Sequence, residues 1–300
     1  MEQRHIGGYN PIPAPLKSFM RFLSMISTRL TLRILAFIFT RPIRYKTPTR
    51  EMQLVEICEQ SKLEVPKTGK VLQVYRLPNN GKKILFMHGW NGRGSQFYHL
   101  ALELHNKGYD ITTFDLPGHG KSSSNWTNIP DISFSVEALM ESLGPFDCLI
   151  SHSMGNIYAL NAANTQRDIP AIITFCHPSM SMRPFFTGYI RMFDLPPEKY
   201  TDRLLDYYKE TLGHPVSDFD PSRFVGDLKV RALIIHCEDD KLVDTRASHE
   251  LHDAIDNSRI VITKGLGHFR ILSDDNVTEE ISDFMASLEP PSRNLSLIHI

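Results

Sequence analysis

The chain has 300 residues, of which 41% are hydrophobic and 22% charged, a composition typical of a globular protein with one large or two small domains. Its 33 basic residues nearly balance its 34 acidic ones, which argues against a nucleic-acid-binding protein that neutralises phosphates over a broad surface. The 4 cysteines show no metal-like spacing and indicate free thiols in a reducing compartment.

The N-terminal segment, residues 1–50, differs in charge from the rest of the chain. It contains nine Lys or Arg residues and one acid, Glu2, so its net charge is +8 and that of the other residues is −9. Polar residues recur at steps of three and four between Lys17 and Arg41, which predicts an amphipathic helix or helix pair. The uncharged run at 34–40 is shorter than the roughly 20 residues that a membrane span requires.

Two interpretations of this basic helical segment remain open. It packs on the domain, or it makes peripheral contact with a membrane surface through residues 17–45. Because no signal-peptide cleavage site follows it, we expect a cytoplasmic protein, with the inner membrane face as the location if the second interpretation holds.

Apolar runs alternate with helix-like segments over the rest of the chain. After a charged connector, strand-like runs are expected at 70–78, 84–89, 109–117, 146–153, 171–178, 230–240 and 259–265, separated for the most part by amphipathic segments. This alternation predicts an α/β fold with a doubly wound, mostly parallel sheet covered by helices on both faces.

The alternation is interrupted at 179–227, where aromatic residues and Met are frequent and no strand pattern occurs. We expect a small helical lid insertion there, with the core formed by 51–178 and 228–290. Residues 291–300 read as a tail, and its last six residues, 295–300, match what one frame of a sequencing-library adapter encodes, so we interpret them as non-native.

Ser153 stands in "SHSMG", where a buried strand is expected to turn into a helix. A nucleophile on such a tight turn needs small residues two positions away on each side, and Ser151 and Gly155 meet this demand. The amide of Met154 lies at the predicted helix N-terminus, where it points toward developing negative charge.

A serine nucleophile requires a histidine base and a carboxylate that orients the base. Just past a late predicted strand the sequence offers four acids, and just past the last strand it offers His268. The four acids are Glu238, Asp239, Asp240 and Asp244.

Four separated motifs occur in one order: "MHGW", "DLPGHGKSS", "SHSMG", and "CEDDKLV" followed by "GHF". With them the chain, from about Lys70 to Leu288, resembles serine hydrolases of the α/β-hydrolase fold. The resemblance implies that Asp240 is the acid, with Asp239 as runner-up, and that His268 is the base. It also implies an oxyanion hole formed by the backbone N–H groups of Trp90 and Met154, and requires neither a metal nor an organic cofactor.

The resemblance further implies hydrolysis of a carboxylic ester or thioester of a small or lipophilic acyl substrate through an acyl-enzyme. Phe185, Phe186 and Tyr189 of the lid either line an acyl pocket or form the packing core of the lid itself. Acyltransferase, C–C hydrolase and cofactor-free haloperoxidase reactions run on the same triad and remain alternatives. A non-catalytic membrane-surface binding protein is the remaining alternative, and the presence of all three triad residues disfavours it.

Overall fold

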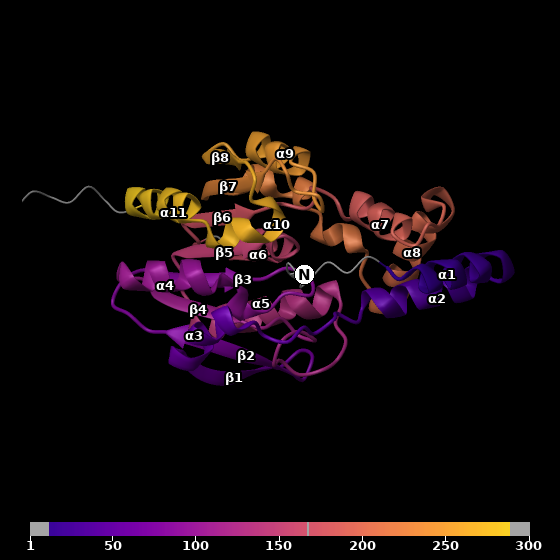
Figure 1. The fold of residues 1–300 in the computed structure, drawn as a ribbon, viewed down its shortest axis with the longest axis horizontal. Coiled ribbons are helices and arrows are strands. Elements are labelled where there is room, and N and C mark those ends of the chain that lie inside the picture. The colour runs from indigo at the N-terminus through magenta and orange to yellow at the C-terminus, as the bar shows by residue number, and fades with distance from the viewer. Residues whose placement is uncertain (1–11, 167, 289–300) are drawn as a thin grey trace, which may run out of the picture.

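Eight strands form one sheet in the order β1-β2-β4-β3-β5-β6-β7-β8 (Figure 1). The computed structural model describes residues 12–166 and 168–288. Strand β2 runs antiparallel to both of its neighbours, and every other neighbouring pair is parallel. The strands are β1 (Glu59–Val65), β2 (Lys70–Leu77), β3 (Lys83–Met87), β4 (Asp110–Phe114), β5 (Cys148–His152), β6 (Ala171–Phe175), β7 (Arg231–Cys237) and β8 (Ser258–Thr263). The predicted doubly wound, mostly parallel sheet is confirmed.

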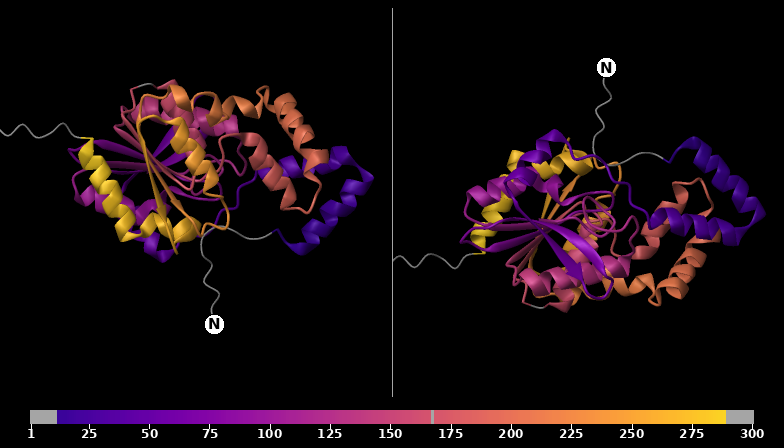
Figure 2. Two further views of the ribbon diagram at one scale, coloured as in Figure 1. Left: turned by 90° about the horizontal axis from the view of Figure 1, so that it is seen from above. Right: turned by 90° about the horizontal axis from the view of Figure 1, so that it is seen from below.

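Helices cover both faces of this sheet (Figure 2). Ile84 and Phe86 of β3 point into one apolar layer, whereas Leu85 and Met87 point into the other. Such burial on both faces explains why the strands read as continuous apolar runs. One face is covered by α3 (Thr49–Ile57), α4 (Tyr98–Asn106) and α11 (Asp275–Ser287), and the other by α5 (Ile129–Leu143), α6 (Gly155–Thr165) and α9 (Arg246–Ala254).

Two pairs of helices that are far apart in the sequence lie together at one end of the molecule (Figures 1 and 2). We call them the helical lobe: α1 (Ala14–Ile26), α2 (Thr28–Phe39), α7 (Met182–Arg191) and α8 (Pro197–Leu212). Ser27, in extended conformation, separates α1 from α2, and its side chain caps α2 by accepting a hydrogen bond from Leu30 N. The turns η2 (Val216–Phe219), η3 (Pro221–Arg223) and η4 (Val225–Asp227) return the chain to β7.

The lobe has an aromatic core centred on Phe39, at the end of α2. The Phe39 ring lies 5.0 Å from the ring of Phe186 and 5.3 Å from that of Tyr189, both on α7. The Tyr189 hydroxyl donates a hydrogen bond of 2.8 Å to the Leu35 carbonyl oxygen, and Tyr208 of α8 lies 5.8 Å from Phe39. The N-terminal helices and the insertion therefore fold against each other.

None of the helices in the described ranges has the length and apolar character needed to cross a lipid bilayer. The predicted tail at 291–300, with its six suspected non-native residues, lies outside the described residues.

Candidate active site

Ser153 occupies a strained turn between β5 and α6. Its φ angle is +54°, in the left-handed region that side chains rarely adopt. The Ser153 N–H donates a hydrogen bond of 2.9 Å to the Phe175 carbonyl oxygen. A Cβ atom at Gly155 would lie 2.4 Å from the Met87 carbonyl oxygen, so glycine is required for α6 to start this close to β3.

Two buried polar side chains support the turn from beneath. The Ser151 hydroxyl donates to Asn156 Oδ1 at 2.7 Å, and Asn156 Nδ2 donates to the Phe175 carbonyl oxygen at 2.8 Å. Phe175 thus accepts hydrogen bonds from both the Ser153 amide and the Asn156 amide group. Through these contacts, Phe175 of the neighbouring strand β6 holds the strained backbone of Ser153 in place.

Asp240 and His268, which follow β7 and β8, are in direct contact. His268 Nδ1 donates to Asp240 Oδ2 at 2.6 Å, and both side chains are buried. Asp240 Oδ1 also accepts hydrogen bonds from the amides of Leu242 and Val243. Burial raises the pKa of Asp240, but hydrogen bonds from His236 and His268 outweigh burial, so the net pKa lies well below the usual range. The carboxylate is therefore ionised and orients the imidazole.

Ser153 and His268 line one pocket, at the edge of the sheet where the parallel strands have their carboxyl ends. Among the described residues, the Ser153 hydroxyl has no hydrogen-bond partner, so it is free to meet an incoming carbonyl group.

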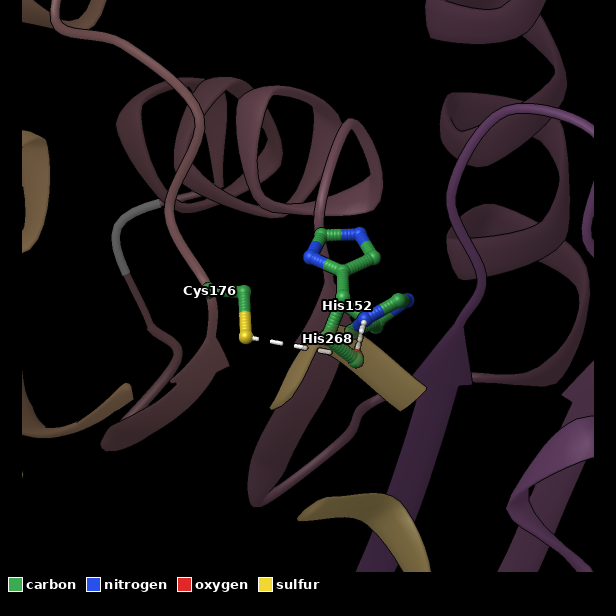
Figure 3. A group of neighbouring side chains, drawn as sticks. All are labelled: His152, Cys176 and His268. Carbon is green, nitrogen blue, oxygen red and sulfur yellow. Dashed lines mark hydrogen bonds between the residues drawn. The ribbon is translucent and has the colours of Figure 1, made fainter. Parts of the chain in front are cut away.

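His152, the neighbour of Ser153, has a different environment from His268. Its Nε2 donates to the His268 carbonyl oxygen at 2.9 Å, and the two rings lie 4.6 Å apart (Figure 3). Burial and the nearby His268 ring lower the pKa of His152 well below its ordinary value. His152 is therefore neutral and holds the backbone that carries His268.

The candidate oxyanion hole lies between the β3 loop and the start of α6. Neither the Trp90 nor the Met154 amide donates a hydrogen bond to another of the described residues. A Cβ atom at Gly89 would lie 2.9 Å from Ser153 Cβ, which shows how closely this loop approaches the nucleophile. Within the described part of the chain, these two amides therefore keep unused donors on the two segments that meet at Ser153.

His88 holds this loop in place. Its Nδ1 donates to the Gly89 carbonyl oxygen at 2.7 Å, and its Nε2 accepts a hydrogen bond from the Leu116 amide at 2.9 Å. Burial lowers the pKa of His88 to about 3, so the ring is neutral and able to accept as well as donate. His88 thereby ties the loop after β3 to the loop after β4.

The pocket has a volume of about 540 Å³ and a mixed lining. Apolar side chains line it together with Ser153 and His268: Leu242, Val243, Phe269 and Leu272. The segment after α2 adds Tyr45, Lys46, Pro48 and Arg50 to the rim. No sequence signal predicted this contribution, because residues 41–48 have no periodic pattern.

The lid aromatics lie elsewhere, which corrects one of the two interpretations given for them. Phe185, Phe186 and Tyr189 do not line this pocket. Phe186 is fully buried, and all three rings contact Phe39. They pack the lobe between α7 and α2, so the packing interpretation describes these side chains and the pocket interpretation does not.

Side chains that the motifs did not highlight also contact the Asp240–His268 pair and its surroundings. His236 Nδ1 lies 2.6 Å from Ser248 Oγ, and its Nε2 lies 3.4 Å from Asp240 Oδ2. The Cys237 thiol accepts a hydrogen bond of 3.0 Å from the Gly267 amide, next to His268. Both residues end β7 as part of a buried strand, so the sequence pattern alone indicated only packing.

Among the residues that the structure describes, two groups of His, Cys and Asp side chains have the spacing of metal ligands. They are His152 with Cys176 and His268 (Figure 3), and Cys176 with His236 and Asp240. Burial and the Asp240 charge raise the pKa of the Cys176 thiol well above its ordinary value, which disfavours the thiolate that metals prefer. The nitrogen of His268 nearest Asp240 is engaged by that carboxylate. The donor set fits a hydrogen-bonded network better than a metal centre.

A sequence profile of the Alpha/beta hydrolase family matches residues 84–280. The chain belongs to this family. The alpha/beta hydrolase YisY of Bacillus subtilis (strain 168) is 21% identical over 229 residues, which cover 63% of this chain and 85% of that protein. The pimeloyl-[acyl-carrier protein] methyl ester esterase of Xanthomonas campestris is 32% identical over 93 residues, 31% of this chain and 36% of the esterase.

Solved structures of this alpha/beta hydrolase family share the fold at low identity. The esterase Pf2001 of Pyrococcus furiosus superposes with a TM-score of 0.63 at 18% identity, over 82% of this chain and 98% of the esterase. At that identity the likeness concerns the fold, and the chemistry rests on the site described above.

Proposed function

We propose that this alpha/beta hydrolase is a serine hydrolase that cleaves a carboxylic ester or thioester of a small or lipophilic acyl group. The observation that carries the proposal is the buried Asp240–His268 pair in the same pocket as Ser153 on its strained turn. The esterases among the relatives support the class of reaction.

The geometry supports a two-step mechanism. His268, oriented by Asp240, takes the proton of Ser153 as the Ser153 oxygen attacks the acyl carbon. The amides of Trp90 and Met154 stabilise the oxyanion, and the leaving alcohol or thiol takes the proton from His268 as the acyl-enzyme forms. Water, deprotonated by His268, then attacks the acyl-enzyme and releases the acid, with the proton returned to Ser153.

Covalent labelling tests the nucleophile directly. We expect a fluorophosphonate probe to label the full-length protein and to label Ser153→Ala not at all, with hydrolysis of p-nitrophenyl acyl esters reduced by about 10⁴-fold or more. Ser273→Ala is the matched control, because Ser273 lines the same pocket and lies away from the turn. Equal labelling of Ser153→Ala and the wild-type protein would rule the proposal out, as would a folded wild-type protein that takes no label and hydrolyses no ester or thioester.

A further inference from the structure

Exposed apolar side chains are concentrated in the helical hairpin α1–α2. Seven of the eleven large apolar side chains that are exposed in the described part of the chain lie in or just after it. Met25 is 78% exposed and Ile26 65%, although both are residues that folding normally buries. The seven, which we call the hairpin surface, are Phe19, Phe22, Met25, Ile26, Leu30, Phe37 and Ile43.

The exposed apolar residues of the hairpin surface are spaced so that they share one face of each helix. On α1, Phe19, Phe22 and Ile26 follow one another at steps of three and four, which places them on one face. Leu30 and Phe37 share a face of α2 with Arg33 by the same spacing. This face is additional to the one that Met20, Leu35 and Phe39 bury inside the molecule.

Basic side chains without acidic partners accompany the apolar ones. No Asp or Glu occurs between Gln3 and Arg50. Arg21, Arg29 and Arg33 are exposed and make no ion pair with any described residue. Lys17 differs, because it pairs with Asp194 of the lobe at 3.0 Å. The hairpin surface therefore combines apolar area with uncompensated positive charge.

We propose that the hairpin surface binds an anionic lipid membrane, with α1 and α2 lying in the plane of the interface. Basic residues near such a membrane gain attraction from the lipid phosphates and carboxylates, and exposed Phe, Leu, Ile and Met side chains enter the boundary of the acyl chains. A second copy of this chain fits less well, because a symmetric dimer through this surface would bring two positive patches together.

The position of the hairpin connects membrane binding with the pocket. In Figure 1 the hairpin lies at the end of the molecule away from the sheet, beside α7 and α8. The chain leaves α2 at Phe39 and continues into the rim of the pocket at Tyr45 and Lys46. Binding of the hairpin surface to a membrane would thus hold this rim close to the lipid headgroups.

Vesicle sedimentation of the full-length protein tests the proposal independently of hydrolysis. We expect the protein to sediment with phosphatidylcholine vesicles that contain phosphatidylserine and to remain in solution with phosphatidylcholine alone. Arg29→Glu with Arg33→Glu should weaken partitioning by roughly 30-fold or more, since each basic residue near the surface contributes about fivefold. Phe22→Ser with Met25→Ser and Ile26→Ser should weaken it at least about tenfold.

Matched controls place the same changes elsewhere on the surface. Lys62→Glu with Lys107→Glu reverses two exposed charges on other elements, and Ile57→Ser removes an exposed apolar side chain from α3. Both controls should sediment like the wild-type protein, and circular dichroism checks that each variant is folded. Absence of wild-type sedimentation with anionic vesicles overturns the proposal, as does equal sedimentation of the two hairpin variants and the controls. If the wild-type protein binds no vesicles but forms a dimer in solution, and the triple variant Phe22→Ser, Met25→Ser, Ile26→Ser is a monomer, the hairpin surface contacts a second copy of the chain instead.

Discussion

The carboxyl edge of the sheet buries charged and polar side chains, whereas the helical lobe exposes apolar ones. At the sheet edge the charged Asp240 is buried and accepts hydrogen bonds from the Leu242 and Val243 amides and from His268. In the lobe, Phe22 and Met25 are exposed although the chain has an apolar core to receive such residues. Buried polar groups with defined partners fix a geometry, which catalysis requires, whereas exposed apolar groups serve contact with another surface.

The largest expected effect concerns Asp240, on which the geometry of the sheet edge depends. Asp240→Asn keeps the shape of the side chain but removes the charge that orients and stabilises the His268 imidazole. We expect kcat for ester hydrolysis to fall by about 10⁴-fold, as judged by steady-state kinetics with a p-nitrophenyl ester. Asp239→Asn is the control, because the Asp239 side chain accepts a hydrogen bond from Gly265 and has no contact with His268. A larger loss in Asp239→Asn would make Asp239 the acid.

The second effect is on stability and concerns a buried ion pair behind the oxyanion loop. Arg93, three residues after Trp90, donates two hydrogen bonds to Glu51, which is 3% exposed and also accepts one from Ser95. Glu51→Ala leaves the Arg93 charge without its partner, so we expect the free energy of unfolding in urea to fall by about 3–5 kcal/mol.

The control for Glu51 is a carboxylate in an exposed ion pair. Glu137→Ala removes the partner of Lys67, whose side chain is largely exposed, and should change the free energy of unfolding by less than about 1 kcal/mol. Similar losses in Glu51→Ala and Glu137→Ala would contradict the view that burial makes the Glu51–Arg93 ion pair important for stability.

The third effect is a pH dependence of the free energy of unfolding, which we expect to arise from buried histidines at the sheet. Burial lowers the pKa of His88, His119 and His177 to about 3, and all three follow strands of the sheet. Between pH 6.5 and 3 the unfolded chain therefore binds more protons than the folded protein, so the free energy of unfolding falls as the pH falls through this window. Each histidine contributes a slope of up to about 1.4 kcal/mol per pH unit.

One variant isolates a single histidine of this group. His177→Leu should reduce the pH dependence of the free energy of unfolding by the slope of one proton, measured by urea unfolding at several pH values between 7 and about 4. His214→Leu, which removes an exposed histidine just after α8, is the comparison variant. If the two variants have the same profile, the acid sensitivity does not arise at the sheet edge.

The sequence predicted most of the sheet but not the packing of the helical lobe. Strands β2 to β7 could be predicted because most of their residues are buried and form apolar runs. Ser153, Asp240 and His268 could be named as candidates because short motifs with fixed spacing contain them, and the structure places His268 against Asp240 and in one pocket with Ser153. Strand β1 was not predicted, since its residues are mostly exposed and charged. The packing of Phe39 on Phe186 was not predicted either, because a contact between residues so far apart leaves no periodic trace in one sequence.

The smallest effect tests whether the two regions are coupled. The rings of Phe39 and Trp90 stack with centroids 5.0 Å apart and planes 6° apart, which joins the end of α2 to the loop whose Trp90 amide we propose as an oxyanion donor. Phe39→Leu removes this stacking, worth about 1 kcal/mol. We expect the Trp90 amide to be held less firmly and kcat to fall roughly fivefold, with KM little changed.

A second lobe variant separates this coupling from a general loosening of the lobe. Phe193→Leu makes the same change in volume at a fully buried ring that meets Tyr189 edge to face. It should lower the thermal midpoint of unfolding by about as much as Phe39→Leu while leaving kcat at the wild-type value. Equal losses of kcat in both variants would mean that the oxyanion loop responds to the stability of the lobe as a whole. A loss confined to Phe39→Leu would place the coupling at the Phe39–Trp90 contact, through which a hairpin bound to a membrane would act on the site.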